Sequence, residues 1–464
     1  MNPEQFLRDH SPRPEDLCLS RRQFLQRAGM GFGALGLAGL LSRTPVLGAA
    51  SPAPTIKPHF AVKATRVIHI FAQGGPSHVD TWDPKPLLNQ RDGQDLPDLK
   101  GVAMGSSFKF SRHGKSGIEV SEVFSEIAKH VDDLAVIRSM HTDIPAHDVA
   151  TIFMNTGSLR MAKPSLGAWT LYGLGSENEN MPGFISLRPG GSPPGGVLNW
   201  GSAFLPGNFQ ATSINTRAAS VEQMIQNIRN PYLGKEEQRR QLDLVQKLNA
   251  AHQKNLQDDP QLEARIQSFE MAYRMQMEAT DAFDISKEPA TLRELYGDSA
   301  QGRQMLIARR LIERGVRFVQ VWAGGWDHHE DIATRLSASA QEVDRPAAAL
   351  LADLKQRGLL DDTLVIWGGE FGRTSDSQGA KGRDHNPNGF TIWMAGGGVK
   401  RGLHYGATDP FGYKAVEKKV HVNDLHATLL HLMGLNHEDL TYRFNGRDFR
   451  LTDVAGSVIN EILA

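Results

Sequence analysis

The sequence has 464 residues, a formal net charge of -1, and is 40% hydrophobic and 22% charged. These values are ordinary for a soluble globular protein, and the lack of a basic bias argues against a nucleic-acid partner or attraction to an anionic membrane. The only cysteine is Cys18. A chain that has lost its N-terminal residues would therefore have no disulfide and no thiolate ligand, and any metal would be held by oxygen and imidazole.

The first 50 residues are predicted to be a removed export signal. Arg21 and Arg22 are followed by Gln-Phe-Leu, a glycine-rich apolar run from 28 to 41, and small residues around Ala50. This order is typical of a signal peptide of the twin-arginine type, the alternative being an ordinary N-terminal helix. The run is too short to span a bilayer, and no later run is long enough for a transmembrane helix. We expect export by the twin-arginine translocase to the periplasm or cell envelope.

The rest of the chain is predicted to form one α/β domain. A linker rich in Pro, Ala and Ser covers 51–62, and the domain covers 63–464 with a helical insertion at about 218–295. Short β-branched runs predict strands, and helical spacing of apolar residues predicts helices. We expect a central, mostly parallel sheet flanked by helices. The predicted strands are 66–71, 134–140, 317–322, 363–367 and 390–394, and the main helices are 120–130, 301–314, 332–357 (kinked or restarted at Pro346) and 424–434.

Metal-ligand residues follow the first strand, and a histidine begins a later helix. Two glycines after strand 66–71 lead to His78 and Asp80, which lie on one side if that loop stays extended, so both are predicted ligands. The alternative is a simple turn. After strand 134–140, His147 and Asp148 begin a helix whose N-terminus suits an anion. Asp148 is predicted to cap this helix, while His147 could be a ligand, a base or a nucleophile.

Three further clusters lie close together in the sequence. Because ligands of open α/β sheets bind at the carboxyl ends of the strands, we predict that these clusters build one polynuclear metal site from separate loops. The alternative is a set of helix caps, turn residues and solvated loop charges. The residues are Asp327, His328 and His329 after strand 317–322, Glu370 and Arg373 after strand 363–367, and Arg383, Asp384 and His385 before strand 390–394.

These motifs resemble a bacterial family. Gly-Gly-Pro-Ser-His-Val-Asp, Gly-Gly-Trp-Asp-x-His, Gly-Glu-Phe-Gly-Arg-Thr, Gly-Arg-Asp-His and the closing Arg-Asp-Phe-Arg-Leu-Thr-Asp-Val look like a group of uncharacterised, twin-arginine-exported proteins. That group is related to sulfatases within the alkaline phosphatase superfamily. The resemblance covers essentially the whole chain after the leader, and it implies an alkaline phosphatase/sulfatase-like fold.

The resemblance also implies a site with two divalent cations and a nucleophile between them. The superfamily's ligands match Asp80, Asp327, Glu370 and His385, and the group's own Asp-x-His pattern favours His329 over His328. Phe371 stands where the superfamily has a ligating histidine, so the second cation would be weakly held or absent, unless His78 compensates. His147 falls at the nucleophile position, and no Cys-x-Pro-x-Arg motif is present, which argues against a formylglycine sulfatase.

The sequence therefore favours an exported, metal-dependent hydrolase of sulfate or phosphate esters. One or two divalent cations are expected, with zinc, calcium, manganese and magnesium not distinguished. His147 would be acid/base or nucleophile, Asp384 a ligand or an orienting group, and Arg373 or Arg383 would pair with an anionic small-molecule or glycan ester. The rival function is a catalytically degenerate protein that binds a sulfated glycan or a protein partner.

Overall fold

The structure is a computed structural model, and the described part of the chain begins at residue 56. The predicted leader and residues 51–55 of the predicted linker lie outside it. The described residues are 56–97, 99–159, 161–178, 180–218, 220–224, 234–253, 273, 275 and 281–464.

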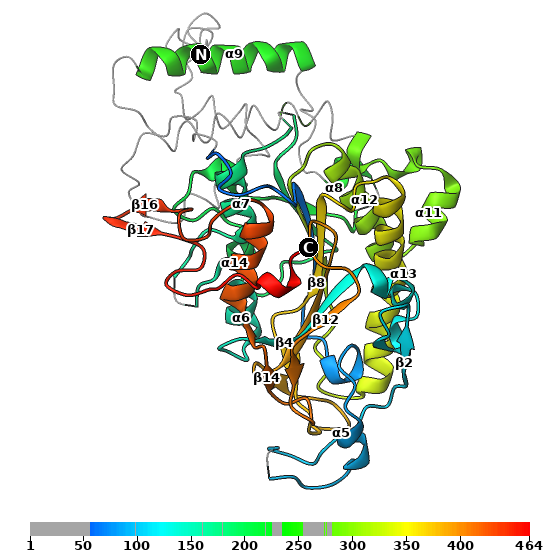
Figure 1. The fold of residues 1–464 in the computed structure, drawn as a ribbon. Coiled ribbons are helices and arrows are strands. Elements are labelled where there is room, and N and C mark those ends of the chain that lie inside the picture. Colours follow the sequence, from blue (N-terminus) through cyan, green and yellow to red (C-terminus); the bar gives the residue numbers. More distant parts are fainter. Residues whose placement is uncertain are drawn as a thin grey trace, which may run out of the picture.

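A nine-stranded sheet forms the centre of the molecule (Figure 1). Its order is β12-β4-β11-β8-β1-β7-β5-β6, with β15 also pairing with β4. Only β11 runs antiparallel to its neighbours β4 and β8, so the predicted mostly parallel sheet is confirmed. The strands are β1 (Arg66–Ala72), β4 (Leu134–His141), β5 (Phe184–Arg188), β6 (Thr212–Asn215), β7 (Phe318–Ala323), β8 (Thr363–Gly368), β11 (Phe390–Ala395), β12 (Leu403–Tyr405) and β15 (Val420–His421).

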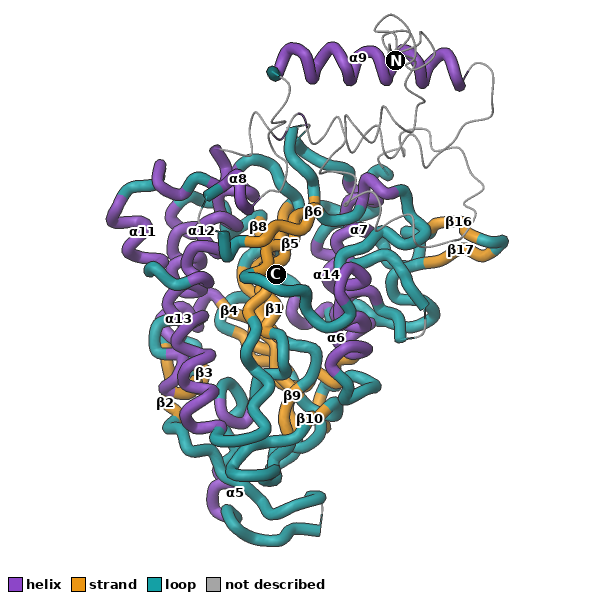
Figure 2. The backbone as a smooth tube through the Cα atoms, turned by 180° about the vertical axis from the view of Figure 1, so that it is seen from behind, coloured by secondary structure: helices purple, strands orange, loops and turns teal. Residues whose placement is uncertain are grey.

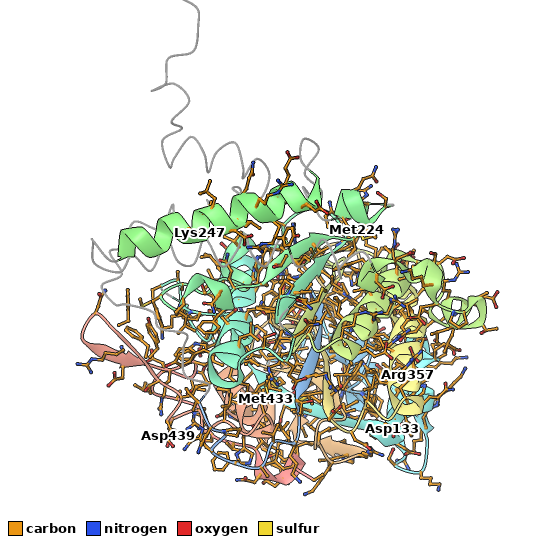
Figure 3. All side chains as sticks on the ribbon, turned by 90° about the horizontal axis from the view of Figure 1, so that it is seen from above. Asp133, Met224, Lys247, Arg357, Met433 and Asp439 are labelled. Atoms are coloured by element: carbon orange, nitrogen blue, oxygen red, sulfur yellow. The ribbon has the colours of Figure 1, made fainter. Side chains whose placement is uncertain are left out.

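Helices cover both faces of the sheet, which explains why its strands read as continuous apolar runs. On β1, Ile68 belongs to one core and Val67 to the other. The two helical layers lie on opposite sides of the strands in Figure 2, and side chains fill the space between the layers in Figure 3. One layer contains α12 (Ala300–Glu313) and α13 (Ile332–Gln356), and the other contains α6 (His147–Thr156), α7 (Leu166–Leu174) and α14 (Val422–Leu432).

Outside the central sheet, the described residues also form four small hairpins and a short helix. The hairpin β9–β10 matters most for the site, because it follows β8 and carries two arginines and a histidine. The pairs are β2 (Phe110–His113) with β3 (Ile118–Ser121), β9 (Gly372–Arg373) with β10 (His385–Asn386), β13 (Ala407–Thr408) with β14 (Ala415–Glu417), and β16 (Tyr442–Phe444) with β17 (Arg447–Phe449), and the helix is α5 (Pro86–Gln90).

Two helix predictions differ from the structure. The predicted helix 120–130 is wrong, because β3 ends at Ser121 and 3₁₀ turns follow. The Asp344 carboxylate, on α13, accepts hydrogen bonds from the backbone N–H groups of Glu126 and Ile127. These contacts with α13, and not an α-helix, hold the segment in position. Of the two alternatives predicted at Pro346, the restart is wrong, because α13 continues through this residue without a break.

Parts of the predicted insertion and of the predicted linker are among the described residues. The insertion contains α8 (Val221–Met224), α9 (Lys235–Gln253) and α11 (Ala290–Tyr296), and α9 stands at the end of the molecule away from α5 (Figure 1). In the linker, the N–H groups of His59 and Phe60 both donate to the Gly434 carbonyl after α14. Residues 56–62 therefore belong to the folded body.

Among the described helices, none combines the length and apolarity needed to cross a bilayer.

Two buried histidines should make the fold sensitive to acid. Burial, with a smaller contribution from their mutual repulsion, lowers the pKa of His69 on β1 to about 3, and burial lowers that of His426 on α14 to about 4. Below the ordinary histidine pKa the unfolded chain binds protons that the native state does not. The free energy of unfolding therefore falls as the pH drops.

When the pH drops from about 7 to about 4, the free energy of unfolding should fall by about 3 kcal/mol less in His69→Gln than in the wild type. Urea denaturation at both pH values measures the difference. The exposed His404 supplies a control, since His404→Gln should behave like the wild type. An acid loss in His69→Gln equal to that of the wild type would contradict the prediction.

Candidate metal centre

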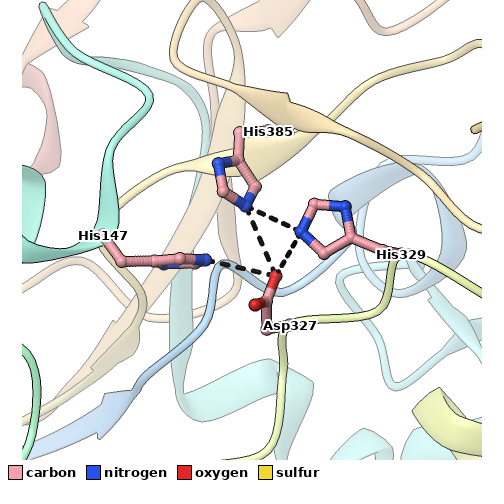
Figure 4. Close-up of side chains that lie close together, drawn as sticks. All are labelled: His147, Asp327, His329 and His385. Carbon is pink, nitrogen blue, oxygen red and sulfur yellow. Dashed lines mark hydrogen bonds and ion pairs between the residues drawn. The ribbon is translucent and has the colours of Figure 1, made fainter.

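Four side chains from three separate segments meet beyond the carboxyl ends of the parallel strands (Figure 4). Asp327 and His329 follow β7, His385 lies on β10, and His147 begins α6. One nitrogen or oxygen atom from each lies within 4.8 Å of the others. Because β7 and β8 both flank β1 in parallel, the loops that follow these strands emerge at one edge of the sheet.

A single carboxylate oxygen is the centre of the cluster. Asp327 Oδ1 lies 2.8 Å from His329 Nε2, 3.1 Å from His147 Nε2 and 3.3 Å from His385 Nε2. His329 Nε2 and His385 Nε2 are 3.0 Å apart. All three imidazoles therefore present the same nitrogen to the same point.

The other nitrogen of each imidazole is held by an oxygen. His147 Nδ1 lies 2.6 Å from Glu370 Oε1, and His385 Nδ1 lies 2.7 Å from the Pro145 carbonyl. His329 Nδ1 lies 2.5 Å from Gln378 Oε1. Because an ionised carboxylate and a carbonyl only accept hydrogen bonds, the Nδ1 atoms of His147 and His385 carry the proton, and in the neutral rings Nε2 keeps a free lone pair.

This arrangement fits a bound cation. Among the described residues His147 Nε2 is buried without a hydrogen-bond partner, although it faces the Asp327 oxygen. Lone pairs that converge on one point repel each other unless a positive charge offsets them. Arg373 does so in part, with Nη1 at 3.4 Å from His329 Nε2, and a cation at the point would face all four donor atoms. Three imidazole nitrogens and one carboxylate oxygen are a donor set for zinc and similar transition ions, and Nδ1 bonds to oxygen are the usual support of metal-ligating histidines.

The electrostatics of the cluster also favour positive charge at this point. Burial raises the pKa of Asp327, but the hydrogen bond and charge of Arg373 and the neighbouring His147 outweigh it and hold that pKa well below its usual range. Burial lowers the pKa of His147, yet Glu370 and Asp327 together raise it above the ordinary value. Burial and the Arg373 charge lower the pKa of His385. The carboxylates of Glu370 and Asp327 therefore favour positive charge at His147.

Glu370, a predicted ligand, orients a ligand candidate instead. Its side chain is fully buried and accepts hydrogen bonds from the Gly74 N–H at 3.0 and 3.2 Å as well as from His147. Gly74 has a φ of +116°, and a Cβ there would come within 2.5 Å of the Asp327 nitrogen. Glu370, which follows β8, therefore links the loop after β1 to the start of α6.

Asp80 and His78, also predicted as ligands, lie outside the cluster. The condition that this loop stays extended is not met, because residues His78–Asp80 form a 3₁₀ helix. Asp80 accepts from Arg383 Nε at 2.6 Å and Nη2 at 3.2 Å, and from the Ser77 hydroxyl at 2.5 Å. His78 Nε2 lies 2.6 Å from the Gly412 carbonyl. Both side chains therefore have partners within the protein core.

The two arginines that were predicted to contact the substrate are also buried in the protein. Arg373 is fully buried, lies 2.5 Å from Asp327 Oδ1 and donates to the Gly75 and Arg383 carbonyls. Arg383 is fully buried against Asp80. Since neither guanidinium reaches solvent, the expectation that either contacts a substrate directly is not met by this structure.

The remaining predicted residues have local roles. Asp384 is exposed, and its Oδ1 accepts from the His385 N–H at 2.8 Å. Asp148 accepts only from the N–H of the next residue, so the predicted helix cap is absent from α6. His328 turns away from its neighbour His329 and lies 3.1 Å from the Ser339 hydroxyl.

Three contacts in the site have no sequence signal that identifies them. Gln378 and the Pro145 carbonyl support imidazoles from loops without a metal-ligand motif. Phe371 lies against the rings of His147 and His385, with centroid distances of 4.8 and 4.7 Å. It gives the cluster an apolar wall at the position where the resemblance implied a histidine.

Comparison with known proteins places the chain in a family. Residues 64–463 match the family model described as "Protein of unknown function (DUF1501)". The chain belongs to the DUF1501 family. The match begins just before β1 and reaches the last residues of the chain, so it includes every residue of the cluster. No curated protein sequence matches the chain.

Similar solved structures include a sulfatase and an alkaline phosphatase. The zinc complex of the C-terminal periplasmic domain of EcEptC from Escherichia coli is 10% identical, with a TM-score of 0.37 and coverage of 84% of this chain and 88% of that one. The PsFucS1 sulfatase from Pseudoalteromonas sp. is 13% identical, with a TM-score of 0.35 and coverage of 92% and 73%. A magnesium-bound variant of TAB5 alkaline phosphatase is 9% identical, with a TM-score of 0.35 and coverage of 81% and 99%. These identities are too low to carry an activity to this chain.

We expect Glu370→Ala to weaken metal binding by about 10–100-fold, because the His147 imidazole loses the acceptor that fixes its proton on Nδ1. Glu370→Gln keeps an oxygen at that position and should have a smaller effect. Competition with a chromophoric chelator measures both affinities. Equal affinity in Glu370→Ala and the wild type would show that His147 needs no such support.

Proposed function

We propose that the protein is an exported metal-dependent hydrolase of phosphate or sulfate esters. The observation that carries this proposal is the convergence on one point of three imidazole nitrogens and one carboxylate oxygen, from side chains that are partly exposed to solvent. The exposed fractions of these side chains are 48% for Asp327, 36% for His329, 20% for His147 and 19% for His385. A cation held there would be accessible to a substrate.

The chemistry follows from the charges around that point. A divalent cation would act as a Lewis acid, polarising an ester oxygen and making a nearby water a better nucleophile. Arg373 offsets the charge of Asp327, so a divalent cation would leave the centre positive and attractive to an anionic ester. In this proposal His147 contributes Nε2 to the cation and is not the nucleophile, because one lone pair cannot serve both purposes.

The ligand chemistry also limits the cation. Magnesium and calcium prefer oxygen ligands, whereas imidazole suits zinc and related transition metals. We therefore propose a transition metal bound by His147, Asp327, His329 and His385. Export to the periplasm or cell envelope remains part of the proposal and rests on the twin-arginine pattern at residues 21–25.

A second candidate is a protein that binds a sulfated glycan or a protein partner without turnover. The ion pair between Arg373 and Asp327 favours it, since the guanidinium can balance the carboxylate without a metal. In such a protein the four side chains would serve as polar groups that recognise the glycan or the partner. The purified protein would then contain no stoichiometric metal.

The deciding experiment compares the wild type with Asp327→Ala. We expect about one equivalent of zinc or a related metal in the wild type and only background metal in the variant, because the variant lacks the oxygen at the centre of the cluster. Hydrolysis of 4-nitrophenyl phosphate and 4-nitrophenyl sulfate should fall by at least about 100-fold. Metal-free wild-type protein, even after reloading, would favour the binding protein.

Adjacent histidines provide a matched pair of variants. His329→Gln should lose most of the bound metal, because Nε2 of His329 belongs to the cluster. His328→Gln should retain it, because that imidazole contacts Ser339. Elemental analysis of both variants, with circular dichroism to verify folding, tests the assignment. Equal metal content in the two folded variants would remove His329 from the ligand set.

A further inference from the structure

The β9–β10 hairpin and the loop that joins its strands supply an arginine to each of two strand-end carboxylates. Arg373, on β9, pairs with Asp327 after β7. Arg383, just before β10, pairs with Asp80 after β1. The two arginines are linked, since Arg373 Nη1 donates to the Arg383 carbonyl at 3.1 Å. The two carboxylates nevertheless differ in what else they face.

Asp80 is enclosed and already neutralised. Both its side chain and that of Arg383 are fully buried. Each carboxylate oxygen accepts from the guanidinium, and Oδ2 also accepts from the Ser77 hydroxyl. Burial raises the pKa of Asp80, but the charge and hydrogen bonds of Arg383 lower it below its usual range. The neighbouring imidazole of His78 is bound to the Gly412 carbonyl.

Asp327 faces one guanidinium nitrogen and three imidazoles, and about half of its side chain is exposed. It can therefore share a cation with the imidazoles. A cation at Asp80 would have to displace a buried, two-point ion pair and would find no imidazole of the described cluster beside it.

We propose that Arg383 takes the place of a second cation, so that this chain builds a mononuclear metal centre. An arginine keeps its charge at all physiological pH values and presents a planar fork that matches a carboxylate. Its charge at Asp80 is therefore permanent, and a chelator cannot remove it. The proposal rests on the metal centre of the proposed function. It adds that exchangeable metal binds at Asp327 and not at Asp80.

The ion pair also explains how the hairpin is positioned. Arg383 donates to the carbonyls of Thr374, Met104 and Gly105 in addition to Asp80. It thus ties the loop that ends at His385 to the loop after β1. Loss of one partner leaves a buried, unpaired charge and is strongly destabilising, whereas removal of both charges is often nearly neutral.

The test is the metal stoichiometry of the full chain and two variants after loading with excess zinc and gel filtration. Asp327→Ala removes the proposed exchangeable site, and the double variant Asp80→Asn/Arg383→Gln removes both charges of the internal pair. We expect about one equivalent in the wild type, about one in the double variant and none in Asp327→Ala. Circular dichroism and thermal unfolding verify that each variant is folded.

The outcomes separate the two proposals. Two equivalents in the wild type that fall to one in the double variant would overturn the mononuclear centre while leaving the proposed hydrolase intact. No metal in the wild type would overturn the metal centre itself. If the double variant does not fold, the wild-type stoichiometry alone decides, because one equivalent supports a mononuclear centre and two contradict it.

Discussion

The site depends on one carboxylate that four positively charged or nitrogen-bearing side chains share. Asp327 Oδ1 lies within 3.3 Å of nitrogens from His147, His329, His385 and Arg373. These side chains come from β9, β10, α6 and the loop after β7, so this oxygen fixes the relative positions of the segments. Without a bound cation, only the Arg373 guanidinium offsets the repulsion between the imidazole lone pairs. Cation binding and local order should therefore be coupled.

Glycines make this convergence possible because they let backbones touch. A Cβ at Gly74 would come within 2.5 Å of the Asp327 nitrogen, and one at Gly382 would come within 1.9 Å of the His329 carbonyl carbon and oxygen. The glycines near the site therefore serve contacts between protein loops. The backbone of Gly74 contacts the loop that carries Asp327 and His329, and a Cβ at Gly75 would meet Phe371.

Much of the fold could be predicted because its signals are local. Apolar runs bounded by turns identified β1, β4, β7, β8 and β11, and the placement of ligand residues at strand ends followed from the parallel sheet. The contacts of individual side chains depend on residues far away in the chain. Asp80 has the ligand type and the position expected of a metal site, yet its partner Arg383 lies 303 positions later. No local pattern distinguishes a carboxylate that faces a metal from one that faces a buried arginine.

The same reasoning explains why the supporting residues were missed. Gln378 and the Pro145 carbonyl act only because the fold brings them to the Nδ1 atoms of His329 and His385. Phe371 was interpreted as the loss of a ligand, but its ring packs on two imidazoles and limits water on that side of the cluster. An apolar wall strengthens electrostatic interactions at the site because it lowers the local dielectric. The position of Phe371 therefore agrees with a single cation whose ligands converge on Asp327, with the phenylalanine ring beside them.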